Sequence, residues 1–219
     1  MTKLDISDPS SIKSLYSTIS QNEKRLDILI NNAGTNDTGD ADVPAPEVVA
    51  VNYGGTKDSC LTFLPLMTQT PGSRIVNVSS VGSKLHHYSA EIKATFRDSK
   101  LTLPQLDDLA KRYCDAVAAG KAKDQGFGGA NGYAVSKACI NSLTAILGRE
   151  NQGKVVVNCC CPGWVDTDMG SIMGQPPKKP EEGARIPFRL AMGDVGGVTG
   201  KYWENPSISD TAEGQVGEW

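Results

Sequence analysis

The chain has 219 residues, 39% of them apolar and 21% charged, a composition typical of globular proteins and unlike that of disordered, collagen-like or coiled-coil chains. At about 150 residues per domain, this length leaves room for one large domain or two small ones. The net charge of −3 and the lack of a basic run exclude nucleic acid as an expected partner. No segment has the roughly 18 consecutive apolar residues of a membrane span, and the first residues carry no apolar signal sequence, so we expect a cytoplasmic protein with no membrane partner.

The six cysteines are too few for a disulfide framework in a chain of this length. Three of them, Cys159, Cys160 and Cys161, are consecutive, and no cysteine or histidine pair has the spacing of a zinc site. Consecutive residues of a strand point to opposite faces and cannot easily bridge each other. We therefore expect reduced thiols in the core and no metal site.

The N-terminal part of the chain predicts the end of a strand, a helix and a second strand. Residues 4–7 have the pattern of a strand that is ending, and Asp8-Pro9 is typical of a helix start with Asp8 as the N-cap. Residues 26–30 form a short apolar run that favours a strand. The helix between them carries one apolar face at the spacing i, i+3, i+4, i+7, which consists of Ile12, Leu15, Tyr16 and Ile19.

The rest of the chain alternates between apolar strands and helices. The pattern predicts helices over residues 47–67, 132–148 and 180–192, and strands over residues 74–79, 154–159 and 200–203. Such alternation is typical of a parallel sheet that helices cover on both faces. The sequence therefore predicts the α/β class, with a doubly wound parallel sheet of the Rossmann type.

Residues 84–131 break this rhythm, because a short connection would suffice between the strand before them and the helix after them. The segment has an amphipathic pattern of its own, made by Leu106, Leu109, Tyr113 and Val117. We interpret residues 84–131 as an inserted flap over one end of the sheet, within a single domain.

Tyr133 and Lys137 form a Y-x-x-x-K pattern, which places a phenol and an ammonium on one face of a helix. A phenol with its ordinary pKa of about 10 is a poor acid at neutral pH, and a neighbouring cation stabilises its phenolate. The pattern also occurs at Tyr53 and Lys57, so spacing alone does not choose between the two. The context favours Tyr133, which follows the strand that ends in Ser79-Ser80.

Open α/β sheets bind their ligands at the carboxyl ends of the strands, where Ser79-Ser80 and the segment Asn31-Asn32-Ala33-Gly34 are expected. A serine hydroxyl there can donate a hydrogen bond to a carbonyl oxygen, and small residues let the backbone approach a flat ligand. Each segment has a plainer interpretation as well. The serines can simply cap the chain after a strand, and the second segment can be an ordinary turn.

Five segments occur in a characteristic order: Asn31–Gly34, Val51-Asn52, Asn77–Ser80, Tyr133–Lys137 and Pro162-Gly163. In order and spacing they resemble the short-chain dehydrogenase/reductase family, over residues 4 to about 203. Within that family the chain is similar to the carbonyl reductases, which share the long insertion before the tyrosine and the stretches that match Cys160–Trp164 and Pro180–Ala184. In relatives with the insertion the helix used for tetramer assembly is covered, so the resemblance implies a monomer.

The resemblance implies NAD(P)H-dependent reduction of ketones, aldehydes and quinones to alcohols, with small-molecule carbonyl compounds as substrates. Tyr133 would protonate the alkoxide as a hydride reaches the carbonyl carbon. Lys137 would lower the pKa of Tyr133 and, with Tyr133, contact the nicotinamide ribose. Ser80 would donate a hydrogen bond to the carbonyl oxygen, and Asn52 would hold a water that links Lys137 to solvent.

The resemblance also implies a site for NADP, with NAD as the alternative. Asp5 matches an acidic residue that meets the adenine amino group. The adenosine side would be lined by Asn32, Ala33 and Gly34, and the loop that faces the nicotinamide carboxamide would consist of Pro162, Gly163, Val165 and Thr167. We interpret Trp164, beside this loop, either as core packing or as a wall of the substrate pocket.

One motif of the family has no counterpart in the sequence. The family begins with T-G-x-x-x-G-x-G at a helix N-terminus, where backbone N–H groups hold the pyrophosphate. Gly126-Phe127-Gly128-Gly129 does not fit the related G-x-G-x-x-G pattern, because position 131 is Asn. We therefore expect an N-terminally truncated, incomplete domain over residues 1–219, whose apolar run at residues 26–30 lies at a bare sheet edge.

The missing motif also supports an alternative function. The chain would then be a catalytically inactive remnant that binds cofactor poorly and acts, if at all, through protein–protein contacts. A hydrolase is not expected, because Val78 stands where a G-x-S-x-G motif around Ser80 needs its first glycine. The two histidines, His86 and His87, are adjacent in a polar stretch and are interpreted as solvated loop residues.

Overall fold

The computed structural model describes residues 2–37, 43–172 and 174–219. Within these ranges five strands form one sheet in the order β1-β2-β3-β4-β5. β1 to β4 pair in parallel and β5 is antiparallel to β4. The strands are β1 (Ile28–Asn31), β2 (Arg74–Val78), β3 (Val156–Cys160), β4 (Tyr202–Glu204) and β5 (Gln215–Val216). The predicted α/β class with a parallel sheet is confirmed, and the short antiparallel strand β5 is an addition that the sequence pattern did not indicate.

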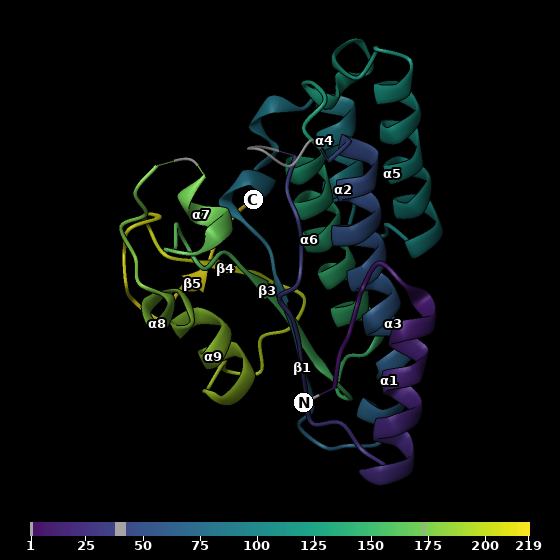
Figure 1. Cartoon of the computed structure of the whole chain (residues 1–219), viewed down its shortest axis with the longest axis vertical. Helices are drawn as coiled ribbons and strands as arrows, with labels where there is room; N and C mark the ends of the chain where they lie inside the picture. The colour runs from purple at the N-terminus through teal and green to yellow at the C-terminus, as the bar shows by residue number, and fades with distance from the viewer. Residues whose placement is uncertain (1, 38–42, 173) are drawn as a thin grey trace.

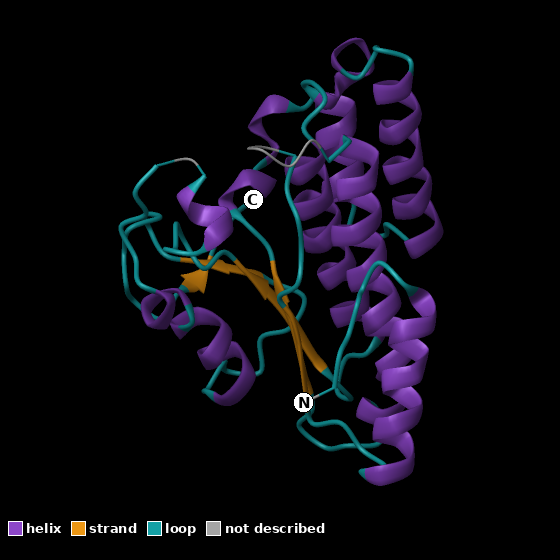
Figure 2. Cartoon of the chain, in the orientation of Figure 1, coloured by secondary structure: helices purple, strands orange, loops and turns teal. Residues whose placement is uncertain are grey.

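Helices cover both faces of this sheet (Figure 1 and Figure 2). One face packs against α3 (Thr56–Met67) and α6 (Gly132–Glu150), with α1 (Pro9–Asn22) outside α3, and the other face packs against α9 (Arg185–Met192). The sheet is therefore doubly wound, as predicted. The remaining helical segments are α2 (Ala45–Val49), η1 (Ala50–Gly55), η2 (Val81–Ser83), η3 (Leu85–His87), α4 (Ala90–Arg97), α5 (Leu103–Ala118), η4 (Lys123–Phe127), α7 (Asp168–Ser171) and α8 (Pro180–Gly183).

Helix α1 begins as its sequence predicts. The Asp8 carboxylate accepts a hydrogen bond from the Ser10 backbone N–H and so satisfies one of the free donors of the first turn. Of the predicted apolar face only Ile12 is fully buried, and Leu15, Tyr16 and Ile19 are partly exposed. The prediction of a strand over residues 4–7 is wrong, because this segment has no neighbouring strand with which to form a hydrogen-bonded ladder.

Two of the predicted helices are interrupted in the structure, at points where the pattern of backbone hydrogen bonds along the helix changes. Residues 47–67 contain the π-helical segment η1 between α2 and α3, and η1 carries Asn52. Such π-helical turns are frequent at functional sites. Residues 180–192 divide into α8 and α9 at Ala184, three residues before Pro187. Because a proline has no N–H, Pro187 cannot donate to the Gly183 carbonyl, and the helix starts again with Pro187 in its first turn.

The main core lies between the sheet and the layer of α3 and α6, and a smaller core lies under α9. All six cysteines have free thiols, and Cys159, Cys160 and Cys161 are buried, as predicted. Burial raises the pKa of the Cys159 thiol to about 12, so this thiol stays protonated at neutral pH.

The segment 84–131 folds into α4, α5 and the shorter turns beside them, and it packs against α6 and α2 (Figure 1). Leu106, Leu109 and Tyr113 are buried on the inner face of α5 and Val117 is partly buried there, which confirms the predicted amphipathic helix. Whether the segment acts as a flap stays a prediction.

Strand β1 lies at one edge of the described sheet, the position that was expected for the apolar run at residues 26–30. Ile30 is 46% exposed at this edge. Edge strands present unpaired backbone groups, so β1 is one of the two edges of the described sheet, with β5 at the other, that are open to further pairing.

Candidate functional site

The carboxyl end of β2 meets the first two turns of α6, and this junction holds Ser80, Tyr133 and Lys137. The Lys137 ammonium donates a hydrogen bond of 2.8 Å to the Val78 carbonyl at the end of β2. One residue further, the Ser79 hydroxyl donates to the Lys137 carbonyl at 3.2 Å. Strand and helix are thus joined by reciprocal contacts, which fix where Ser80 and Tyr133 lie.

The structure brings the side chains of Tyr133 and Ser80 together. Burial raises the pKa of the Tyr133 phenol, and the nearby Ser80 hydroxyl partly offsets this rise. Gly82 lies against both, since a Cβ built on it would be 3.5 Å from Ser80 Oγ and 3.5 Å from Tyr133 Cε1. Tyr133 and Ser80 are both partly exposed.

Lys137 is buried beside this pair, with its ammonium nitrogen 5.5 Å from the centroid of the Tyr133 ring. Burial lowers the pKa of Lys137 to about 8. Its ammonium has three donors, and among the described residues only the Val78 carbonyl accepts from it and no carboxylate pairs with it. The remaining donors are available to a ligand.

Asn52 is fully buried in η1 and ties the loop after β1 to α6. Its Oδ1 accepts from the Thr35 N–H at 2.8 Å, and its Nδ2 donates to the Thr35 carbonyl at 2.9 Å and to Ser136 Oγ at 3.0 Å. The Ser136 hydroxyl in turn donates to the Tyr133 carbonyl at 2.8 Å. Asn52 therefore positions both segments of the site.

Ser136 was missed by the sequence analysis, although it lies inside the Y-x-x-x-K segment. It stands three residues after Tyr133, where a helical side chain returns to the carbonyl of the preceding turn. This three-residue spacing could have indicated a bond from Ser136 to the backbone, but the role of Ser136 depends on its contact with Asn52, which the sequence does not show.

The second Y-x-x-x-K pattern has a different environment. The Tyr53 hydroxyl donates to Asp107 Oδ1 at 2.7 Å, and the Lys57 ammonium lies 2.7 Å from the same oxygen. Tyr53 is 3% exposed, and Asp107 belongs to α5. This pair connects α5 to η1 and α3, away from Ser80 and Lys137, so the choice of Tyr133 from its context is consistent with the geometry.

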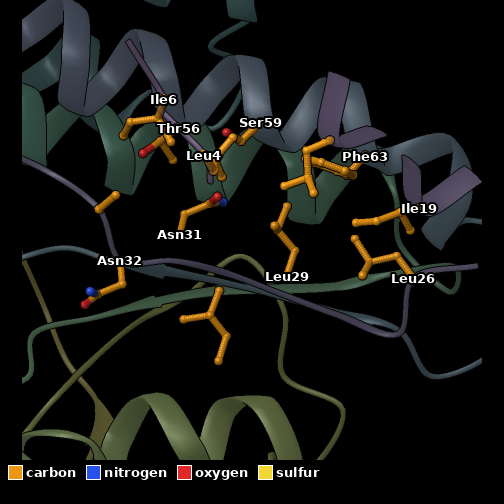
Figure 3. A pocket seen from close by; sticks show the side chains of 13 residues that line it. Leu4, Ile6, Ile19, Leu26, Leu29, Asn31, Asn32, Thr56, Ser59 and Phe63 are labelled. Atoms are coloured by element: carbon orange, nitrogen blue, oxygen red, sulfur yellow. The ribbon is translucent and has the colours of Figure 1, made fainter. Parts of the chain in front are cut away.

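The residues predicted for the adenosine side lie near an apolar pocket of about 120 Å³ (Figure 3). Asn32 and Ala33 line it from the end of β1, and Leu4 and Ile6, the two neighbours of Asp5, line it from the N-terminal segment. The Asp5 carboxylate itself accepts from the Ser7 hydroxyl and N–H, and these bonds lower the pKa of Asp5. Gly34 lies outside this pocket, against Asn52.

The loop of Pro162, Gly163, Val165 and Thr167 leaves the end of β3 on the same side. Gly163 has a φ of +87°, a conformation that favours glycine, and Thr167 caps α7 by accepting from the Gly170 N–H. The partly exposed Trp164 donates from Nε1 to the Gly170 carbonyl at 2.8 Å. Trp164 lies in none of the buried clusters, so it is not part of the core, and its role as a pocket wall stays a prediction.

In the described part of the chain, no three histidine, cysteine, aspartate or glutamate side chains gather as they would around a metal ion. No helix among the described residues is long and apolar enough to cross a bilayer.

Three comparisons with known proteins agree with this geometry. The family model for short chain dehydrogenases matches residues 1–95 and 86–176. Carbonyl reductase (NADPH) 1 of Bos taurus is 36% identical over 213 residues, which are 91% of this chain and 75% of the relative. Carbonyl reductase (NADPH) 1 of Mus musculus is 33% identical over 219 residues, which are 94% of this chain and 77% of the relative.

The solved structures that are similar include reductases from plants and animals. Salutaridine reductase from Papaver somniferum matches with a TM-score of 0.80 and 28% identity, over 91% of this chain and 80% of that one. The NADPH-bound carbonyl reductase from chicken fatty liver has the same fold, with a TM-score of 0.64 and 23% identity over 100% and 76% of the two chains. From the family match and the curated relatives, this chain belongs to the short chain dehydrogenase family.

Proposed function

We propose that the chain reduces small carbonyl compounds to alcohols with NADPH, with Tyr133 as the proton donor. The observation that carries the proposal is that the Tyr133 and Ser80 side chains both lie against Gly82, each 3.5 Å from a Cβ built on it, beside the buried Lys137 ammonium. Relatives at 33–36% identity are named as NADPH-dependent carbonyl reductases, which supports the same reaction and the same cofactor here.

The residues present fit the nicotinamide ribose end of NADPH. Lys137 keeps donors without a protein acceptor in the described part of the chain, and these suit ribose hydroxyls. At Gly34 a Cβ would lie 2.9 Å from Asn52 Oδ1 and 3.8 Å from Lys137 Nζ, so the absence of a side chain keeps this position open. The 219 residues contain no T-G-x-x-x-G-x-G motif, and we assign none of them to the phosphates.

Other contacts follow from the arrangement of the loops. Asn32, Ala33 and Asp5 would contact the adenosine side, and the backbone of Pro162, Gly163, Val165 and Thr167 would face the nicotinamide carboxamide. Trp164 would form a wall of the substrate pocket. When bound, NADPH supplies the hydride that reduces the carbonyl carbon.

The protein's own part in the reaction is to bind and protonate the carbonyl oxygen. Ser80 and Tyr133 both donate hydrogen bonds to it, which stabilises the negative charge that develops there. Burial raises the pKa of the Tyr133 phenol, which is the opposite of the lowering that the resemblance implied, so the phenol is protonated at neutral pH. The Lys137 ammonium, 5.5 Å from the centroid of the ring, would favour the phenolate once the proton has left. Asn52 would hold a water that returns a proton through Lys137.

The insertion supports a proposal about assembly. Nearly every side of α6 is covered by described residues, and α4 and α5 of the segment 84–131 provide part of that cover. We therefore propose that this segment serves as a flap on a monomeric protein. Size-exclusion chromatography with light scattering that gave a tetramer would contradict the assembly proposed.

The decisive experiment replaces the two tyrosines of the Y-x-x-x-K patterns separately. Tyr133→Phe removes the proposed proton donor, and NADPH-dependent turnover of a small quinone is expected to fall by about 10²-fold or more. Tyr53→Phe is the matched control, because its hydroxyl faces Asp107 instead of the site, and its turnover is expected to stay near that of the wild type. Equal turnover by Tyr133→Phe and the wild type would refute the proposed mechanism.

A further inference from the structure

The turn at Pro162-Gly163 rests on a lysine that the proposed reaction does not use. Lys178 is 1% exposed, and its ammonium donates a hydrogen bond of 2.7 Å to the Pro162 carbonyl. In the described ranges this carbonyl is the only acceptor within hydrogen-bond distance of Nζ, and no carboxylate forms an ion pair with it. Lys178 is therefore a buried cation whose ammonium has one hydrogen-bond acceptor among the described residues, a backbone carbonyl of the loop.

The backbone of Lys178 is tied to the same loop. Its N–H donates to the Trp164 carbonyl at 3.3 Å, and its carbonyl accepts from the Asp166 N–H at 2.8 Å, so that Val165 and Lys178 form a parallel bridge. The main chain of Lys178 thus runs beside the second half of the loop, while its side chain returns to the first half.

Gly163 and the Lys178 side chain fit closely together. A Cβ built on Gly163 would lie 2.9 Å from Lys178 Nζ and 2.9 Å from Lys178 Cδ. The residue has a φ of +87°, so glycine is needed here for both space and conformation. With Gly163 in this conformation, its N–H points to Cys161 Sγ at 3.4 Å and the Pro162 carbonyl points to the ammonium.

A buried ammonium costs free energy that an apolar side chain of similar length would not. Packing alone would therefore be served as well by methionine, and the distinctive contribution of lysine is its hydrogen bond to Pro162. We propose that Lys178 is a positioning residue, which orients the Pro162–Thr167 loop and, if the proposed function holds, thereby fixes the backbone groups that face the nicotinamide.

The test compares Lys178→Met with Lys179→Met, which removes the neighbouring, exposed ammonium. Hydrogen–deuterium exchange without cofactor is expected to become about tenfold faster over residues 162–167 in Lys178→Met and to stay unchanged in α6. NADPH binding, measured by fluorescence titration, is expected to weaken about tenfold, the size of one charge-assisted hydrogen bond. Lys179→Met is expected to match the wild type in both measurements.

The outcomes separate this inference from the proposed reaction. Wild-type exchange rates over residues 162–167 in Lys178→Met would overturn it, as would equal loss of NADPH affinity in both lysine variants. If Lys178→Met does not fold, Lys178→Arg takes its place, because arginine retains a cationic donor. The guanidinium does not fit beside Gly163, so exchange over residues 162–167 is expected to be faster than in the wild type while exchange in α6 is unchanged. Unchanged exchange over residues 162–167 refutes the inference. A wild-type chain without affinity for NADPH would refute the proposed function, while the exchange experiment would still decide the role of Lys178.

Discussion

Replacing Gly34 by alanine tests the tightest contact of the candidate site. The new Cβ would lie 2.9 Å from Asn52 Oδ1, a distance that real Cβ atoms essentially never show, so the Asn52 amide must move. That amide is held by the Thr35 N–H, the Thr35 carbonyl and Ser136 Oγ, at 2.8, 2.9 and 3.0 Å. A shift that relieves the contact therefore weakens the hydrogen bonds that join the loop after β1 to α6.

The magnitude follows from these bonds. Loss of one or two buried hydrogen bonds costs about 2–3 kcal/mol, and the smaller entropy of an unfolded chain with alanine offsets about 0.5–1 kcal/mol of it. We expect Gly34→Ala to lower the free energy of unfolding by about 1–2 kcal/mol. Urea denaturation followed by circular dichroism measures this change, and NADPH-dependent turnover is expected to fall with it.

Gly54→Ala provides the control on the neighbouring segment. Gly54 belongs to η1, and a Cβ built on it meets no atom within 4 Å. Alanine there is expected to stabilise the fold by about 0.5–1 kcal/mol, since glycine is unfavourable inside a helix. If the two alanine variants shift the urea midpoint in the same direction, the proposed role of the Gly34–Asn52 contact is refuted.

Two further predictions concern buried polar groups. The Tyr113 hydroxyl is buried without a hydrogen-bond partner in the described part of the chain. Tyr113→Phe is therefore expected to leave the urea midpoint unchanged or to raise the free energy of unfolding by up to about 1 kcal/mol, and a marked loss of stability would contradict this. Lys137 has a pKa of about 8 in the folded chain against 10.5 ordinarily, so between these pH values the unfolded chain binds the proton that the folded chain has lost, and stability rises with pH. Relative to Lys137→Met, the wild type is expected to gain up to about 3 kcal/mol between pH 7.5 and 10.5, and parallel stability profiles for the two proteins would count against the buried cation.

Periodicity identified most elements, because it reports how a segment buries its own side chains. The spacing of Leu106, Leu109 and Tyr113 predicted α5, and the apolar run at residues 74–79 predicted β2. Where a strand depends on hydrogen bonds to a neighbouring strand, the local sequence pattern was not enough to predict it. Residues 4–7 have strand-forming residues but no partner strand, and β5 forms only because β4 is beside it.

The candidate site divides in the same way. Tyr133, Lys137 and Ser80 could be found from motif and position, since the carboxyl ends of neighbouring parallel strands meet at one edge of the sheet. Ser136 and Lys178 could not be found in this way, because their roles depend on Asn52 and Pro162, which lie 84 and 16 residues away along the chain. The two Y-x-x-x-K patterns also lie in different environments. The Tyr53 hydroxyl donates a hydrogen bond to Asp107 on α5, a contact that the motif does not indicate.

The sequence by itself determined the α/β class, the order of most helices and strands, and which residues are candidates for acid chemistry. These properties depend on side-chain type and on spacing along a few turns of chain. The tertiary structure decided which hydroxyls lie near each other, which lysine ammonium groups are buried away from solvent, and which backbone carbonyls accept hydrogen bonds from them. Such properties depend on distances between segments that are remote in sequence, and packing of the whole domain alone sets those distances.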